Sequence, residues 1–339
     1  MRAIWTTRLG KPDTLEVRET PDPEPGPNQV RVRVRAAGLN FADVMARQGL
    51  YPDAPKLPAV MGYECAGEID AVGPEVRDFA VADRVMAFTR FGGQSDCVCV
   101  DPAYVFRIPE QLSFEDAAAL PVSYLTAYHM IFNVARVRPG DHVLVHSAAG
   151  GAGTAALQLC RSIGAVATYG TASGSKHDYA REHGCTHPID YHTQDYVAEV
   201  RRLTNGRGVD FVLDALGGGD WKKGYGLLRP GGLLIAFGFA NMNKGNSRQL
   251  VHVVSQALRV PLYTPLKLMS ENRGVAGVNM GHLWDEAELL GSAAQHILAL
   301  YSQGRIAPHV HATFPFEQAA EAHRLLESGQ SLGKIILVP

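Results

Sequence analysis

The sequence predicts a two-lobed fold of the α/β plus β class, in which a β-barrel lobe is joined to a doubly wound parallel sheet. Three observations lead to this expectation. The first third of the chain has short β-rich runs separated by Gly, Pro and Asp, the middle alternates helices with buried strands, and the last residues are β-rich again. At 339 residues, the chain is also longer than one hydrophobic core usually organises.

The barrel lobe is expected to contain a half-buried strand over residues 29–36. Val30, Val32 and Val34 fall on one face of this strand, and the arginines between them fall on the other. Further short β runs are expected over 61–85 and 97–108, where turn residues interrupt them. This punctuation favours a compact antiparallel barrel over βαβ units.

The second lobe is expected to begin at Ser123 with a helix, followed by a turn at residues 139–141 that leads into its first strand. Helices are predicted over 154–163 and 196–204. The predicted strands are 142–147, 167–171, 187–190, 209–215, 233–238 and 274–280. Six strands joined by helical crossovers make a doubly wound parallel sheet.

The C-terminal tail is expected to return to the barrel lobe. A long amphipathic helix over 286–303 precedes β runs at 313–316 and 334–338, which enclose one more helix. The predicted domains are therefore residues 1–122 for the substrate and catalytic lobe, 123–282 for the parallel-sheet lobe, and 283–339 for the return. A ligand cleft is expected between the two lobes.

The composition excludes several classes of function. Lys and Arg number 32 against 34 Asp and Glu, which gives a net charge of −2, so nucleic acid is not an expected partner. The sequence has no apolar leader and no apolar stretch that is long enough to span a bilayer, so a cytoplasmic location without membrane insertion is expected. Five irregularly spaced cysteines are expected to be free thiols: Cys65, Cys97, Cys99, Cys160 and Cys185.

A glycine-rich turn carries the strongest functional signal. It follows the predicted strand 142–147, spans Ala148 to Gly153, and leads directly into a helix. Small residues there allow a pyrophosphate to approach the backbone, and the start of the helix offers free N–H groups and a positive dipole. Ala148 replaces the first glycine of GxGxxG, while Gly150 and Gly153 hold the second and third positions. Together with its strand and helix, this turn predicts a dinucleotide site, and no GxxxxGK[ST] phosphate loop occurs.

The end of the second strand of this lobe indicates which dinucleotide is bound. From Tyr169 to Lys176 there is no carboxylate, which in NAD-specific proteins would bind the ribose hydroxyls and repel a 2′-phosphate. The hydroxyls of Ser173 and Ser175 and the ammonium of Lys176 suit a phosphate dianion instead. NADPH is therefore the predicted cofactor, with a solvated polar loop as the alternative interpretation.

Several motifs together resemble the medium-chain dehydrogenase/reductase superfamily: residues 38–43, 62–68, 148–153 and 333–337. Within it, the chain is similar to the zinc-independent quinone oxidoreductases and especially to their VAT-1-like branch, to which residues 271–274, 282–284 and 314–317 point. The resemblance spans nearly the whole chain. It implies a GroES-like barrel lobe and a Rossmann domain.

The zinc alcohol dehydrogenases of this superfamily have a cysteine where Asn40 stands and a histidine where Tyr63 stands. An amide and a phenol do not replace these zinc ligands. Cys97 and Cys99 form a single CxC pair, which fits two residues on one face of a strand better than a structural zinc site. No metal is therefore predicted.

Without a metal, an electron-poor acceptor is favoured, because a conjugated system spreads the incoming charge. The resemblance implies quinones or α,β-unsaturated carbonyls reduced by NADPH. The predicted catalytic residues are Asn40, Asp43, Tyr51 and Tyr63. Asn40 would bind ribose or substrate oxygen, Asp43 would anchor its loop, and either tyrosine would donate a hydrogen bond or serve only in packing. Thr126 and Tyr128 are expected to face the cleft from the helix that joins the lobes.

The predicted cofactor contacts extend beyond the loop. The turn after the fifth strand lies at the carboxyl edge of the sheet, where it is expected to bind the nicotinamide carboxamide. The resemblance implies that Lys176 and Tyr191 hold the 2′-phosphate and ribose, and that Gly333 and Lys334 close over the nicotinamide. The full predicted set is Thr126, Ala149, Gly150, Gly151, Ala152, Gly153, Thr171, Ser173, Lys176, Tyr191, Leu216, Phe237, Gly238, Phe239, Gly333 and Lys334.

Two other functions stay open at this point. One is a dinucleotide-binding vesicle or structural protein whose turnover is incidental, and the other, less favoured, is a zinc alcohol dehydrogenase. The strand at 274–280 is expected to be an apolar sheet edge, and such edges are usually covered or paired with a second copy. A homodimer is therefore predicted.

Overall fold

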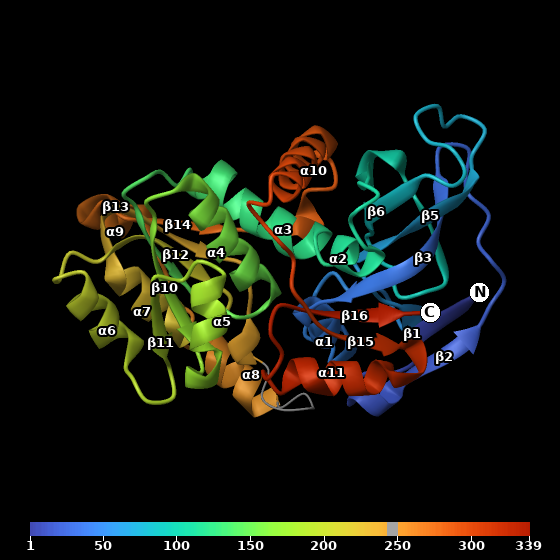
Figure 1. The fold of residues 1–339 in the computed structure, drawn as a ribbon. Coiled ribbons are helices and arrows are strands. Elements are labelled where there is room, and N and C mark those ends of the chain that lie inside the picture. The colour runs from blue at the N-terminus through green and yellow to red at the C-terminus, as the bar shows by residue number, and fades with distance from the viewer. Residues whose placement is uncertain (243–249) are drawn as a thin grey trace.

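Two lobes lie side by side in the computed structural model, which describes residues 1–242 and 250–339 (Figure 1). The N-terminus and the C-terminus both lie in the lobe at the right of Figure 1, and the middle of the chain forms the lobe at the left. The chain therefore leaves the barrel lobe, builds the second lobe and returns to the barrel lobe.

The barrel lobe contains a seven-stranded sheet and a three-stranded sheet. The larger sheet has the order β15-β16-β3-β5-β6-β8, with β7 also paired to β3, and the smaller has the order β2-β1-β4. The predicted face pattern of β3 is confirmed, since Val30, Val32 and Val34 are buried. The strands are β1 (Arg2–Thr6), β2 (Leu15–Glu19), β3 (Val30–Leu39), β4 (Ala59–Val60), β5 (Glu64–Val72), β6 (Arg84–Phe88), β7 (Cys97–Val100), β8 (Val105–Arg107), β15 (Val310–Pro315) and β16 (Lys334–Val338).

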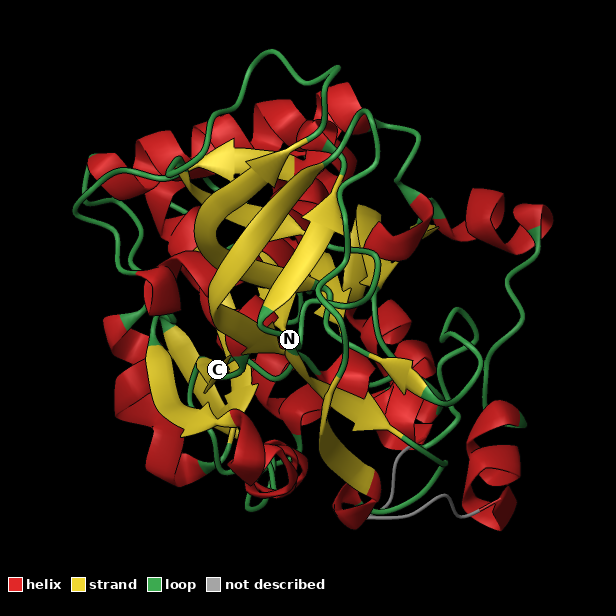
Figure 2. Ribbon diagram, turned by 90° about the vertical axis from the view of Figure 1, so that its right-hand side faces the viewer, coloured by secondary structure: helices red, strands yellow, loops and turns green. Residues whose placement is uncertain are grey.

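The second lobe is a six-stranded parallel sheet with the order β11-β10-β9-β12-β13-β14, which confirms the doubly wound prediction. Helices flank the sheet in Figure 1, and Figure 2 shows the molecule from the barrel side, with both termini toward the viewer. The strands are β9 (His142–Val145), β10 (Ala167–Ala172), β11 (His187–Asp190), β12 (Val209–Asp214), β13 (Leu228–Ala236) and β14 (Gly274–Gly277). The helices are α4 (Gly151–Ile163), α5 (His177–Glu182), α6 (Tyr196–Leu203), α7 (Gly219–Leu227), α8 (Leu250–Ala257) and α9 (Pro265–Glu271).

The last two strands of this sheet differ from their predicted bounds. β13 begins five residues early because Leu228 pairs with Val209 ahead of an irregularity in the register. β14 ends at Gly277, three residues early, because the Asn279 side chain accepts a hydrogen bond from the Gly281 amide at 3.0 Å and starts a 3-10 turn over Met280–His282. The chain thus turns back over the edge of the sheet.

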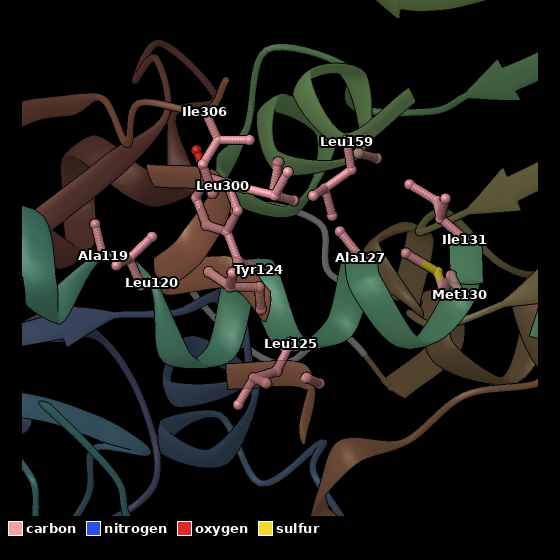
Figure 3. Packing of buried hydrophobic residues seen from close by; sticks show 14 of the residues in the cluster. Ala119, Leu120, Tyr124, Leu125, Ala127, Met130, Ile131, Leu159, Leu300 and Ile306 are labelled. Atoms are coloured by element: carbon pink, nitrogen blue, oxygen red, sulfur yellow. The ribbon is translucent and has the colours of Figure 1, made fainter. Parts of the chain in front are cut away.

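The remaining helices connect the lobes or cover the barrel. β16 pairs antiparallel with β3, so the tail completes the sheet in which the chain began. α3 crosses between the lobes, and Figure 3 shows its apolar side chains packed with Leu159 of α4 and Leu300 of α10. These helices are α1 (Phe41–Arg47), α2 (Phe114–Ala118), α3 (Pro121–Tyr128), α10 (Ala287–Ser302) and α11 (Ala319–Glu327).

The structure also shows the state of the cysteines and the character of the helices. All five cysteines are free thiols, as expected. Across residues 1–242 and 250–339, no helix has the combination of length and apolar character that crossing a bilayer requires.

Candidate functional site

A cleft of about 1380 Å³ runs between the two lobes. The barrel lobe contributes residues around α1 and β5, the second lobe contributes the carboxyl ends of its strands, and the C-terminal tail contributes the turn before β16. The predicted cleft is therefore present, and the elements that form it are far apart in the sequence.

The glycine-rich turn lies on the wall of this cleft between β9 and α4. A side chain on Gly153 would place its Cβ 2.2 Å from the Ser147 carbonyl oxygen, so only glycine lets α4 pack so closely on β9. The first three amides of α4 have no acceptor in the described part of the chain. They are the groups that a diphosphate requires, and residues 149–153 all line the cleft.

The C-terminal tail joins the glycine-rich turn directly. The Gly333 amide donates a hydrogen bond to the Ala149 carbonyl oxygen at 2.8 Å, and Gly150 forms an isolated bridge with Gly333. Gly333 has a φ of +59°, and a Cβ there would lie 2.4 Å from the His309 carbonyl oxygen. This position therefore needs glycine, and it places Lys334 at the junction of the lobes.

The end of β10 carries the predicted phosphate-binding side chains. Ser173 and Lys176 line the cleft, and the Lys176 ammonium donates hydrogen bonds to the carbonyl oxygens of Gly329 and Ser331 at 2.6 and 2.7 Å. Partial burial lowers the pKa of Lys176. An ammonium has three N–H groups, so one remains for an anion.

Asp190, at the end of β11, is a carboxylate near this loop that the sequence interpretation did not consider. Its Oδ2 lies 3.0 Å from where a Cβ on Gly174 would stand. The carboxylate accepts hydrogen bonds from the His192 amide and the Thr193 hydroxyl, and it does not line the cleft. Its own loop therefore holds it away from the wall on which Ser173 and Lys176 lie.

Asn40 belongs to a buried polar network at the barrel side of the cleft. Its amide donates to Glu64 Oε1 at 2.7 Å and its Oδ1 accepts from the Lys334 ammonium at 2.6 Å. Lys334, which is 4% exposed, also pairs with Glu64 Oε1. Glu64 Oε2 accepts from the Val122 amide at 2.6 Å, so the carboxylate is bound on both oxygens.

Asp43 lies behind this network and does not line the cleft. It is fully buried, and its two oxygens accept hydrogen bonds from the amides of Asn40 at 2.8 Å and Gly62 at 3.1 Å. Burial raises the pKa of Asp43 to about 7, against the opposing effects of these hydrogen bonds and of Lys334. Through these two hydrogen bonds Asp43 links the start of α1 to the residues just before β5. This is the geometry expected of a residue that anchors the Asn40 loop.

The two predicted tyrosines meet in the cleft. The rings of Tyr51 and Tyr63 contact edge to face, with centroids 5.9 Å apart, and Phe91 packs on the far side of Tyr63. Burial raises the pKa of both phenols, so both stay protonated at neutral pH. Tyr51 also donates a long hydrogen bond of 3.5 Å to Asn279.

The cleft brings together all of the predicted cofactor residues and three of the four predicted catalytic residues, Asp43 being the exception. One further expectation is wrong. Tyr128 does not face the cleft, because its hydroxyl is bonded to His296 of α10 at 3.0 Å and its ring packs on Phe132. The cleft-facing side of α3 carries Val122 and Thr126 instead, and His129, the first residue after α3, follows them at helical spacing.

The sequence interpretation missed Glu64, Ser123, His129 and His146, which line the cleft or hold residues that do. Glu64 left one signal, a charged residue directly before the apolar residues Cys65 and Ala66, in the buried first half of β5. His146 is fully buried and hydrogen-bonded to the Thr171 hydroxyl at 3.0 Å, below the predicted ribose site. No spacing in the sequence pairs His146 with Thr171, because the two residues lie at the ends of the neighbouring strands β9 and β10.

Comparison with known proteins agrees with this geometry. Residues 26–110 match the alcohol dehydrogenase GroES-like domain, and residues 183–337 match a zinc-binding dehydrogenase family. The quinone oxidoreductase of Escherichia coli, solved in complex with NADPH, superposes with a TM-score of 0.89 at 27% identity over the full length of both chains. The human VAT-1 homolog-like protein superposes with a TM-score of 0.86 at 36% identity, covering 100% of this chain and 98% of that one.

The family of the chain is shown by its similarity to the synaptic vesicle membrane protein VAT-1 homolog of Rattus norvegicus. It is 47% identical over 304 residues, which is 90% of this chain and 75% of the relative. The chain belongs to the VAT-1 branch of the medium-chain dehydrogenase/reductase superfamily. It is thus a member of an oxidoreductase superfamily whose barrel and Rossmann lobes match those described above.

A zinc ion does not fit the network that this VAT-1-like chain has at Asn40. The Lys334 ammonium already occupies the Glu64 carboxylate and the Asn40 carbonyl, and a fixed cation there repels a metal ion. The described residues also contain no group of three or more His, Cys, Asp or Glu side chains arranged to bind a metal. The zinc-binding description of the matching family therefore has no counterpart in this site.

Proposed function

We propose that this protein is an NADPH-dependent reductase that transfers a hydride to quinones or α,β-unsaturated carbonyls without a catalytic metal. The observation that carries the proposal is that one cleft is lined both by the free amides of α4 and by Asn40 and Lys334, which the buried Glu64 carboxylate joins behind its surface. The α4 amides suit a dinucleotide. The Asn40–Glu64–Lys334 network puts a neutralised ion pair in the place of a metal.

The cofactor preference rests on the end of β10. NADPH, when bound, supplies the hydride. The amides of residues 151–153 would hold its diphosphate, and Ser173 with the free N–H of Lys176 would hold the 2′-phosphate. The complex of the Escherichia coli relative with NADPH supports this assignment.

The acceptor preference follows from the walls beside Asn40. Met45, Phe88, Met280 and Leu283 make that part of the cleft largely apolar. Charge that develops on an acceptor oxygen would be met by hydrogen-bond donors, which are sufficient for a conjugated acceptor but weak for an isolated ketone. The acceptor gains a hydride from the cofactor and a proton from water, so a quinone leaves as a hydroquinone.

Asn40 would orient the acceptor or the cofactor ribose, with its side chain fixed by Glu64 and Lys334. Tyr51 or Tyr63 would donate a hydrogen bond to the acceptor oxygen. We expect Tyr51→Phe or Tyr63→Phe to lower kcat about ten-fold or more while the Kd for NADPH changes little. Steady-state kinetics of both variants test this, and unchanged turnover in both would show that the phenols serve only in packing.

The decisive experiment combines a binding assay with a turnover assay. Fluorescence titration of the purified protein with NADPH is expected to saturate, and NADPH oxidation is expected with 9,10-phenanthrenequinone and with simple enones. Relatives that are named as synaptic vesicle membrane proteins suggest the second candidate, a vesicle-associated role that keeps the nucleotide site. Saturable NADPH binding without turnover of any acceptor would favour that role, and absence of NADPH binding would overturn the proposal itself.

A further inference from the structure

His129 is a cleft residue for which neither the sequence motifs nor the proposed roles account. It is half-buried, it lines the cleft, and it lies one turn beyond Thr126 on the same face of the lobe-joining helix. It also begins a π-helix over His129–Ala135, where α3 (Pro121–Tyr128) loses its regular hydrogen bonding. Such π segments are rare and are concentrated at functional sites.

The backbone that carries His129 is rigid. Its neighbours Ala127, Met130 and Ile131 are fully buried, and Figure 3 shows Ala127 and Leu159 of α4 in the same apolar cluster. α3 also contacts the 3-10 turn Met280–His282, which closes the acceptor end of the cleft. The histidine therefore lines the cleft from a well-packed segment, directly after the helix that contacts the turn at the acceptor end.

The hydrogen bonding of the ring determines which nitrogen faces the cleft as a donor. The Asn133 side-chain amide lies 3.2 Å from His129 Nδ1, and an amide NH₂ group can only donate. In this orientation of the Asn133 amide Nδ1 accepts, which leaves the proton of the neutral ring on Nε2. Burial lowers the pKa of His129, which favours this neutral form. In the described part of the chain, Nε2 has no hydrogen-bond partner.

We propose that His129 is a further catalytic residue, which donates a hydrogen bond from Nε2 to the acceptor oxygen on which negative charge develops. The inference rests on the proposed reductase function and adds to it a residue that is fixed before the acceptor binds. No proton leaves the ring. The oxygen takes its proton from water, and the imidazole stabilises the charge until then.

Two variants separate the hydrogen bond from the shape of the side chain. His129→Phe keeps a ring of similar size without a donor, and His129→Gln keeps an N–H group at a similar reach. With 9,10-phenanthrenequinone as the probe, we expect kcat/KM to fall about ten-fold or more in His129→Phe and to be largely retained in His129→Gln. The Kd for NADPH should change less than about two-fold in either variant. His296→Phe is the matched control, because His296 contacts the same helix outside the cleft.

The outcomes distinguish this inference from the function on which it rests. If wild-type protein binds NADPH but reduces no acceptor, the proposed function fails, and the affinity for 9,10-phenanthrenequinone, measured by fluorescence quenching, becomes the readout for His129. Weaker quinone binding in His129→Phe but not in His129→Gln supports the hydrogen bond. Equal turnover of wild type and His129→Phe, or equal quinone affinity where there is no turnover, overturns it. A loss that His129→Gln shares in full also overturns it, because shape alone would then explain the effect.

Discussion

At the scale of single residues, Lys176 has two tasks that a substitution would separate. Its ammonium holds the carbonyl oxygens of Gly329 and Ser331, and its remaining N–H is available to a phosphate. We expect Lys176→Ala to raise the Kd for NADPH by ten-fold or more, since a charge-assisted hydrogen bond contributes about 1.5–3 kcal/mol. The Kd for NADH should rise much less. Titrations with both nucleotides test this, with Lys222→Ala of α7, outside the cleft, as the charge-matched control. An equal rise in the Kd for both nucleotides would mean that Lys176 only holds the carbonyl oxygens of its loop and does not bind the 2′-phosphate.

Asp43 makes a prediction about pH, because burial raises its pKa from 3.8 to about 7. The folded protein therefore retains a proton that the unfolded chain has lost between these two values. The contribution of this group to stability is present below about pH 4 and declines as the pH rises toward 7. Relative to Asp43→Asn, which cannot titrate, the stability advantage of the wild type should shrink by roughly 1.4 kcal/mol per pH unit in this window.

Denaturant unfolding at a series of pH values measures this difference. Asp178→Asn, at an exposed position on α5, is the control for a general effect of removing a carboxyl group. A difference between wild type and Asp43→Asn that grows with pH would mean that the hydrogen bonds from Asn40 and Gly62 outweigh burial and keep Asp43 ionised.

The same residues show how far a sequence can predict a site. Asn40 and Tyr63 were identifiable because their positions in recognisable motifs can be compared with metal ligands. The pairing of Glu64 with Lys334 was not identifiable, because 270 positions separate the two residues and only the return of β16 to the barrel brings them together. His129 was missed because a lone histidine carries no periodicity, and its role depends on where α3 ends.

At the scale of secondary structure elements, α1 is held at both ends. At its start, Asn40 and Asp43 form a capping box. At its end, the buried Arg47 guanidinium pairs with Glu327 of α11 at 2.5 Å and with the Gly10 carbonyl oxygen. The helix that presents the Asn40 network is thereby fixed to the tail that supplies Lys334.

Removing one partner of this buried ion pair leaves a charge without compensation. We expect Arg47→Met to destabilise the protein by about 3–5 kcal/mol, because the buried Glu327 carboxylate would lose its ion-pair partner. The double variant Arg47→Met with Glu327→Leu should recover much of this loss. Arg18→Met, which removes an exposed ion pair with Glu16, should cost less than about 1 kcal/mol. Melting temperatures of the four proteins test the prediction, and a double variant no more stable than Arg47→Met would contradict it.

Element boundaries were predictable where periodicity and turn residues agreed. β11 and β16 begin and end as expected. β16 is an apolar run that begins directly after Gly333, whereas β11 is a short strand in which only Ile189 is buried. The early start of β13 was not predictable, since it includes Pro230 and two glycines that ordinarily end a strand. The early end of β14 depends on the side chain of Asn279, which an apolar pattern does not register.

At the scale of the whole molecule, the outer edge of the parallel sheet is the least covered surface. β14 pairs only with β13 in the described part of the chain, and the segment before it, α8 and α9, exposes many large apolar side chains. More than half of the exposed large apolar residues found in residues 1–242 and 250–339 belong to it. They are Val251, Val254, Leu258, Val260, Leu262, Leu266 and Met269.

Such a concentration of apolar surface beside an unpaired strand favours the homodimer that the sequence predicts, since a two-fold contact covers the same patch on both copies. We expect light scattering to give the mass of a dimer for the wild type. Leu262→Glu, at a position that is 92% exposed, should shift the protein to monomer by placing two carboxylates across the contact. Because the side chain is exposed, the fold of each copy should keep nearly the same melting temperature. Val81→Glu, at an exposed apolar position on the barrel lobe, is the control and should leave the mass unchanged. A monomeric wild type would refute the dimer, whereas a dimer that Leu262→Glu does not disturb would move the interface away from α8 and α9.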